Sequence, residues 1–366
     1  MSDSTPAINA AVLLAALLLC CASAPASSDS PDALNACSTI DDDQARLACY
    51  DRFMGRAPAT PIAAHAPILT APSPAPAMTA PTVADAAPAA SAGAGGASGT
   101  SLLTRAWSFD PDSDRYLIKL YRPNYLNPVR WQSRTNDQPF TPIFTALKTD
   151  NSDLDKVEAA FQISFKTRFW ASNDRRWGAW FAYTQQSFWQ VYNGNISSPF
   201  RDTNYEPELK LAWQPKLHWG GFDWQLLSVG YTHESNGRAD PISRSWDRLV
   251  AEIGVEKGNF ALLLRPWIRI DDDSADSDNS DIIDYYGYGD LTAVYKWHGH
   301  SFTLTGRGNL AQKKGALRVT WMTPRLLGPL RGYVVGFTGY GDTLLDYNFK
   351  QNAVSVGIAL NDLLDR

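Results

Sequence analysis

A histidine and a serine two positions apart, His233 and Ser235, are the strongest candidates for chemistry in this sequence. A serine hydroxyl becomes a nucleophile when a neighbouring base accepts its proton, and histidine serves most often as that base. Residues i and i+2 of a strand project from the same face, so this spacing brings an imidazole and a hydroxyl within reach of a hydrogen bond. The pair indicates acyl transfer at a serine. On spacing alone, two ordinary polar residues at a surface rim are the better explanation.

The residues before this pair alternate in polarity. Leu227 and Val229 share a strand face with His233 and Ser235, whereas Glu234 falls on the opposite face. If the apolar face meets lipid, the histidine and the serine are presented to the bilayer. Polar groups in that position are costly and suggest a functional role, because the interior of a barrel would accept them cheaply.

Asp247 is the third candidate, and it belongs to the next expected strand. It shares a strand face with Leu249 and Ile253. A hairpin that turns through residues 236–245 would bring Asp247 beside His233. A carboxylate in that position can orient the imidazole ring and stabilise the imidazolium that forms during acyl transfer.

The elements that must position these residues are short alternating strands. From Ser101 onward the sequence contains no run of 18 apolar residues, which argues against a helical membrane span. About twelve windows are instead alternating or rich in aromatic and β-branched residues, an even number as in bacterial outer-membrane barrels. We expect an all-β fold, a twelve-stranded antiparallel transmembrane β-barrel over residues 101–366, rather than a soluble β-sandwich. The windows begin near Tyr116, Phe161, Trp177, Asn204, Gly221, Trp246, Phe260, Ile283, Ser301, Gly315, Leu330 and Ala353.

Composition and the start of the chain agree with an exported protein. The 366 residues include 13 Trp, 15 Tyr and 15 Phe, and the formal net charge is -5. Basic residues are scattered, so the stripe of positive charge that nucleic acid requires is missing, and we expect no nucleic-acid partner. Residues 1–26 contain an apolar stretch followed by small residues, which is typical of a secretory signal peptide.

Two further segments are expected between the signal peptide and the barrel. Residues 27–53 contain Cys37 and Cys49, and an even pair in an exported chain predicts a disulfide, although two free thiols remain an alternative. A short helix with Asp41 as its N-cap is expected in this segment. Residues 54–100 are almost entirely small residues and proline, which predicts a disordered linker.

Four separated motifs make the chain resemble the outer-membrane phospholipase A family over roughly residues 116–362. They occur in the same order as in that family. The motifs are Tyr183-Thr-Gln185, the segment from Ser197 to Pro207, the segment from His233 to Trp246, and the segment from Gly339 to Asn348.

The resemblance implies a role for each candidate. Ser235 matches the nucleophile and His233 the general base, and the backbone N–H of Gly237 would contribute to the oxyanion hole. Asp247 is a departure, because the family usually has asparagine where the histidine is oriented. A carboxylate can accept the same hydrogen bond, so we expect activity with an altered pH dependence.

The resemblance also implies calcium and a homodimer. The matching ligands are the side chain of Ser197 of the partner subunit and the carbonyls of Arg238 and Ser243, and all-oxygen ligation suits this hard cation. Asp278 best matches an aspartate that can hold calcium in the monomer. Gln185 matches a residue that helps to join two barrels, and a polar contact between subunits is favourable where hydrocarbon is the alternative.

The expected function is therefore calcium-dependent hydrolysis of the acyl esters of membrane phospholipids, in the bacterial outer membrane and activated by dimerisation. The alternative is a non-enzymatic outer-membrane barrel, either a pore or a scaffold that is a catalytically altered relative.

Overall fold

The computed structural model describes residues 101–141, 154–270 and 279–365, together with five positions between residues 40 and 49. The chain divides into two compact units, Met1–Ser91 and Ala92–Arg366. The expected signal peptide (1–26), the expected linker (54–100), Cys37 and Asp278 lie outside the described residues, and these expectations remain predictions.

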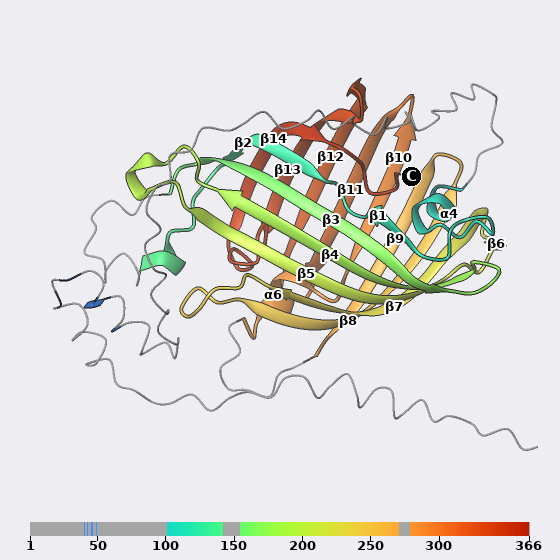
Figure 1. Cartoon of the computed structure of the whole chain (residues 1–366), viewed down its shortest axis with the longest axis horizontal. Helices are drawn as coiled ribbons and strands as arrows, with labels where there is room; N and C mark the ends of the chain where they lie inside the picture. The colour runs from blue at the N-terminus through green and yellow to red at the C-terminus, as the bar shows by residue number, and fades with distance from the viewer. Residues whose placement is uncertain are drawn as a thin grey trace, which may run out of the picture. The chain divides into compact units, whose positions relative to one another are not determined.

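The second unit is a closed barrel of twelve antiparallel strands (Figure 1). Each ring strand pairs with the next along the chain, and the last pairs with the first. The expected fold class is therefore confirmed. No helix among the described residues is long and apolar enough to cross a membrane. The ring consists of β2 (Tyr125–Gln132), β3 (Val157–Ala171), β4 (Trp177–Trp189), β5 (Phe200–Trp213), β7 (Phe222–Ser235), β8 (Ser245–Lys257), β9 (Phe260–Ile270), β10 (Gly289–Trp297), β11 (His300–Asn309), β12 (Lys314–Leu327), β13 (Leu330–Tyr340) and β14 (Lys350–Ala359).

Strand alternation separates an apolar outer face from a polar interior. In β9, Ile268 is 70% exposed whereas its neighbour Trp267 is 4% exposed. Arg265 points inward from the same strand and donates to Asp290, at 3.1 Å from Nε to Oδ1. Because successive side chains point to opposite faces, the charged partners are paired inside while the aliphatic residues meet lipid.

Two of the expected strand windows differ from the structure. The window near Tyr116 is a short strand, β1 (Leu117–Leu120), that pairs with β3 and is not part of the ring. The ring strand β2 was missed because Pro128 and Val129 are both exposed at a register shift, which breaks the period of two. The window near Ile283 is the short helix α6 (Ile282–Tyr286), and β10 begins after it.

The helix α4 (Leu102–Trp107) packs against the inner side of β7 and β8. Ser101 caps it by accepting a hydrogen bond from Thr104 N at 2.9 Å. Leu103 is fully buried and its backbone N–H donates to the Glu256 carboxylate at 2.9 Å. The helix thus anchors the start of the described chain to the interior of the barrel through both an apolar contact and a polar one.

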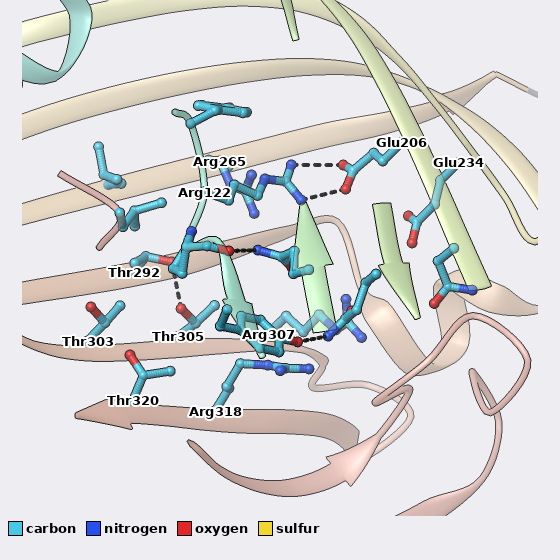
Figure 2. A pocket seen from close by; sticks show the side chains of 18 of the residues that line it. Arg122, Glu206, Glu234, Arg265, Thr292, Thr303, Thr305, Arg307, Arg318 and Thr320 are labelled. Atoms are coloured by element: carbon cyan, nitrogen blue, oxygen red, sulfur yellow. Dashed lines mark hydrogen bonds and ion pairs between the residues drawn. The ribbon is translucent and has the colours of Figure 1, made fainter. Parts of the chain in front are cut away.

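Ion pairs cross the interior and leave a cavity of about 250 Å³ (Figure 2). Arg122 lies 2.5 Å from Glu206, and Arg248 lies 2.7 Å from Glu234 and 3.3 Å from Glu206. These contacts join β5, β7 and β8 to one another and to Arg122 in the segment between β1 and β2. The first alternative raised by the sequence is a barrel that acts as a pore. A solute that crossed such a pore would have to pass through this network of charged side chains.

The first unit contributes only a few described positions. Ala45, Arg46 and Cys49 are helical, and the Asp42 carboxylate accepts a hydrogen bond from Ala45 N at 2.8 Å. The expected N-cap, Asp41, lies outside the described residues and stays a prediction. Cys49 is disulfide-bonded.

Candidate functional site

The register of β7 and β8 places His233 directly opposite Asp247. His233 Nδ1 lies 2.8 Å from Asp247 Oδ1, and since a carboxylate can only accept, the ring nitrogen donates. This bond fixes which ring nitrogen carries the proton and leaves Nε2 available as a base. The hairpin expected from the sequence therefore has the geometry that an oriented histidine needs.

Both side chains lie on the outer face of the barrel. The side chain of His233 is 38% exposed and that of Asp247 is 35% exposed. Their neighbours in the two strands follow the alternation: Thr232 is buried on the inner face, whereas Leu249 is exposed. A histidine and a carboxylate thus form a polar pair on an otherwise apolar outer surface.

Tyr231 adds a contact that the sequence reasoning did not assign. Its phenol oxygen lies 2.5 Å from Asp247 Oδ1, the same oxygen that accepts from His233. The signal was present in the sequence, because Tyr231 stands two residues before His233 and shares its strand face. What the sequence could not show was that its side chain turns toward the next strand.

Ser235 is the last residue of β7 and lies on the same outer face as His233. It pairs with Ser245 on β8 and with Tyr205 on β5. Among the contacts of the described residues, its hydroxyl has no hydrogen bond to His233. The structure thus brings His233 and Asp247 together and places Ser235 beside them without closing the second bond, which in enzymes without substrate is often long or poorly aligned.

The turn after Ser235 is folded around Asn236, a second residue that the sequence reasoning missed. This side chain is 2% exposed. Its amide nitrogen donates to Ile242 O at 2.7 Å, and its amide oxygen accepts from Arg238 N at 3.3 Å and Arg244 N at 3.0 Å. One side chain therefore replaces the backbone hydrogen bonds that the turn lacks.

Gly237 follows at a φ of 60°, in the left-handed region. A Cβ at this position would meet Tyr205 Cε2 at 3.1 Å, so a side chain would be strained as well as crowded. Glycine is consequently the residue that lets the backbone pass close to Tyr205 immediately after Ser235.

Replacing Asn236 by alanine should destabilise this turn. The substitution leaves the buried carbonyl of Ile242 and two partly buried N–H groups without their partner, and an unsatisfied buried group costs about 1–3 kcal/mol before water enters. We expect a lower thermal unfolding temperature in detergent and a loss of any activity that depends on the turn. Asn259→Ala, at an exposed turn between β8 and β9, is the matched control. Unfolding temperatures that match in the two variants would contradict this role.

The three residues expected to hold calcium lie in two loops. Arg238 and Ser243 belong to the turn that Asn236 organises, and Ser197 ends the short 3-10 helix η2 (Gly194–Ile196) at a φ of 60°. The Arg238 guanidinium donates to Phe200 O at 2.9 Å, which ties this turn to the first residue of β5. Among the described residues, no group of three or more His, Cys, Asp or Glu could hold a metal ion.

The loop after β9 is attached to the N-terminal end of β8, which the turn at Asn236 also joins. Asn279 Oδ1 accepts a hydrogen bond from Ser245 N at 3.0 Å, and Asp281 Oδ1 accepts from the Tyr347 phenol at 2.7 Å. Burial, and after it the hydrogen bond to the Asp281 carboxylate, raises the pKa of the Tyr347 phenol. Asp278 immediately precedes this attachment, outside the described residues.

Gln185 lies on the outer face of β4, where its neighbours are also polar. Its amide oxygen accepts from the Tyr183 phenol at 3.2 Å, and its amide nitrogen donates to Ser187 Oγ at 3.4 Å. In register, Gln185 pairs with Tyr205, and Tyr205 pairs with Ser235. At about 4.8 Å per strand, Gln185 and Ser235 are about 10 Å apart on one outer surface.

The interior cavity offers different chemistry from this outer surface. Figure 2 shows Glu206 and Glu234 facing Arg122, with threonine hydroxyls on the other side. The described residues that line the cavity include no histidine, serine or cysteine. The residue types needed for a serine nucleophile therefore meet on the outside of the barrel wall.

Comparison with known proteins places this geometry in a family. The family model described as Phospholipase A1 matches residues 103–360. The phospholipase A1 of Klebsiella pneumoniae is 35% identical over 251 residues, which cover 68% of this chain and 84% of that relative.

Two solved structures have the same barrel. Outer membrane phospholipase A from Escherichia coli superimposes with a TM-score of 0.61 at 34% identity, covering 67% of this chain and 99% of that one. The Salmonella typhi outer membrane phospholipase, a dimer with bound calcium, superimposes with a TM-score of 0.64 at 32% identity, covering 72% of this chain and 98% of that one. The chain therefore belongs to the phospholipase A1 family, as an esterase built on an outer-membrane β-barrel.

Proposed function

We propose that this chain hydrolyses the acyl esters of glycerophospholipids in the outer membrane, with Ser235 as nucleophile, His233 as general base and Asp247 as the group that orients the base. The observation that carries the proposal is the bond of 2.8 Å between His233 and Asp247 on the outer, lipid-facing side of the barrel. A substrate dissolved in the bilayer reaches that face laterally, without entering the interior.

The proposed reaction uses two acyl-transfer steps. Ser235 Oγ forms a bond to the acyl carbonyl carbon while His233 Nε2 takes the hydroxyl proton. The tetrahedral oxyanion accepts a hydrogen bond from the backbone N–H of Gly237. The ester C–O bond then breaks, and the imidazolium returns its proton to the departing lysophospholipid oxygen. Water repeats the sequence on the acyl-enzyme and releases the fatty acid.

Calcium is proposed as the cofactor, held by the carbonyls of Arg238 and Ser243 and the hydroxyl of Ser197. This donor set fits the ion, because all three groups are oxygen donors of the kind that calcium prefers. Asn236 supports the fit, since its hydrogen bonds to Arg238 N and Arg244 N hold both carbonyl-bearing segments of one turn. When bound, the ion would add positive charge near the developing oxyanion. Asp278 is proposed as a calcium ligand in the monomer only.

The homodimer is proposed to assemble through the outer face that carries Gln185. Polar side chains on a lipid-facing strand gain a partner when two barrels meet there. The pairing of Gln185 with Tyr205, and of Tyr205 with Ser235, puts the contact beside the reacting residues. Dimerisation would then bring Ser197 of the partner subunit to the calcium site and act as the switch.

Removal of calcium is expected to abolish most of the activity. We expect fatty-acid release from mixed-chain phospholipid to fall by roughly 100-fold with a chelator, which is about the effect of losing one stabiliser of an oxyanion. Excess calcium should restore it. Release that continues unchanged in chelator would refute the metal role. A failure of the purified chain to release fatty acid with calcium would favour the non-enzymatic barrel.

A further inference from the structure

One oxygen of Asp247 accepts two hydrogen bonds from β7. His233 Nδ1 lies 2.8 Å from Oδ1, and the Tyr231 phenol oxygen lies 2.5 Å from the same atom. Tyr231 and His233 are two residues apart on the outer face, so both reach across to the one carboxylate on β8. The contact of Tyr231 is the shorter of the two.

Among the described residues of β8 and β9, the neighbours of Asp247 on its own face carry no charge. On β9 its register partner is Ile270, and along β8 its neighbours on the same face are Ser245 and Leu249. Within the described part of these strands, the titratable groups that face the carboxylate are His233 and Tyr231. Of these, only the phenol remains a neutral donor while the imidazole changes charge during the reaction.

An ionised carboxylate on the lipid-facing surface loses more hydration free energy than a neutral amide does. An ionised group beside hydrocarbon is stabilised only when hydrogen bonds replace its lost water. A phenol that donates to a carboxylate forms a charge-assisted hydrogen bond, which is shorter and stronger than one to a neutral oxygen. The phenol benefits as well, because its own hydroxyl would otherwise lack a partner on an apolar face.

We propose that Tyr231 is a positioning residue for the hydrolysis: its phenol donates to the Asp247 carboxylate and holds it aimed at His233, so that aspartate can serve at this position. The proposal rests on the proposed function, because Asp247 matters here as the group that orients the base. It adds that Tyr231 acts through Asp247 and that its effect depends on the charge of that residue.

The test is a double-mutant cycle in purified, calcium-supplied protein. Tyr231→Phe should lower kcat by roughly 10-fold with little change in KM, because the change removes the contact with Asp247 and keeps the aromatic ring on the outer face. In an Asp247→Asn background, where the acceptor is neutral, the same change should lower kcat by no more than about 2-fold. Tyr295→Phe is the matched control, a lipid-facing tyrosine that is 47% exposed; its kcat should equal that of the unmodified chain.

The split between kcat and KM separates positioning from a general loss of structure. Tyr231→Phe removes one hydrogen bond to the Asp247 carboxylate and keeps the aromatic ring. The loss should therefore fall on kcat, while KM and the unfolding temperature stay near those of the unmodified chain.

The two proposals fail in different ways. Equal losses of kcat in both backgrounds, or an unchanged kcat in Tyr231→Phe, would each overturn the role of Tyr231 while leaving the hydrolase function intact. A lowered unfolding temperature with the same loss of kcat in both backgrounds would make Tyr231 a structural residue and would also overturn the proposal. If the unmodified chain releases no fatty acid with calcium, the proposed function and the role of Tyr231 fall together.

Discussion

Ser235→Ala is expected to lower fatty-acid release from phospholipid by roughly 10,000-fold or more, which is about what the loss of a serine nucleophile costs in serine hydrolases. The physical reason is that the change removes the proposed nucleophile, without which the acyl-enzyme cannot form. The fold should survive, because the Ser235 side chain lies on the outer face rather than in the interior network. The measurement is initial release in detergent micelles with saturating calcium.

Ser245→Ala is the matched control for this experiment. Ser245 is the cross-strand partner of Ser235 and carries the same hydroxyl on the neighbouring strand. We expect its release rate to stay within about 3-fold of the unmodified chain, the range of ordinary surface substitutions. Comparable rates for Ser235→Ala and the unmodified chain would refute the serine mechanism, and comparable losses in the two variants would indicate damage to the strand end.

The fold was predictable because its determinants are local. A period of two between apolar and polar residues gives both the strand and its outward face, and Trp267 and Ile268 follow it. The prediction of individual strands broke down where the period breaks. Pro128 lies at a register shift in β2. The apolar run beginning at Ile282 folds as the helix α6, whose Ile282 and Tyr286 pack in a buried cluster with Trp246 and Trp267.

The site was predictable to the level of strand parity and hairpin pairing. Parity placed His233 and Asp247 on one face, and a hairpin placed them side by side. The contacts of Tyr231 and Asn236 could not be predicted in the same way. The contact of Tyr231 depends on the rotamer that directs its side chain across to β8. The contacts of Asn236 depend on the conformation of a turn. The alternation of polar and apolar residues along a strand predicts neither.

The sharpest test of the proposed dimer mixes Ser197→Ala with Ser235→Ala, because the two inactive variants should restore activity to each other. Ser197→Ala alone should lose roughly 100-fold through the calcium site. After the two variants are mixed in equal amounts and allowed to exchange, half of the dimers are mixed. In each mixed dimer one site keeps its own Ser235 and receives the partner's Ser197, so about a quarter of the activity should return.

The control uses two residues of one subunit. Ser235→Ala mixed with His233→Gln should restore nothing, because each proposed site takes both residues from its own chain. The alternative is that Ser197 acts within its own subunit. The hydrogen bond of 2.9 Å from the Arg238 guanidinium to Phe200 O supports this alternative, because it ties the turn after Ser235 to the strand that follows Ser197 in the same subunit. If Ser197 acted within its own chain, no mixed dimer would hold an intact site, and the mixture would stay as inactive as its components. Recovery in the Ser197 mixture alone would therefore assign this ligand to the partner and make association of two barrels a requirement of the chemistry.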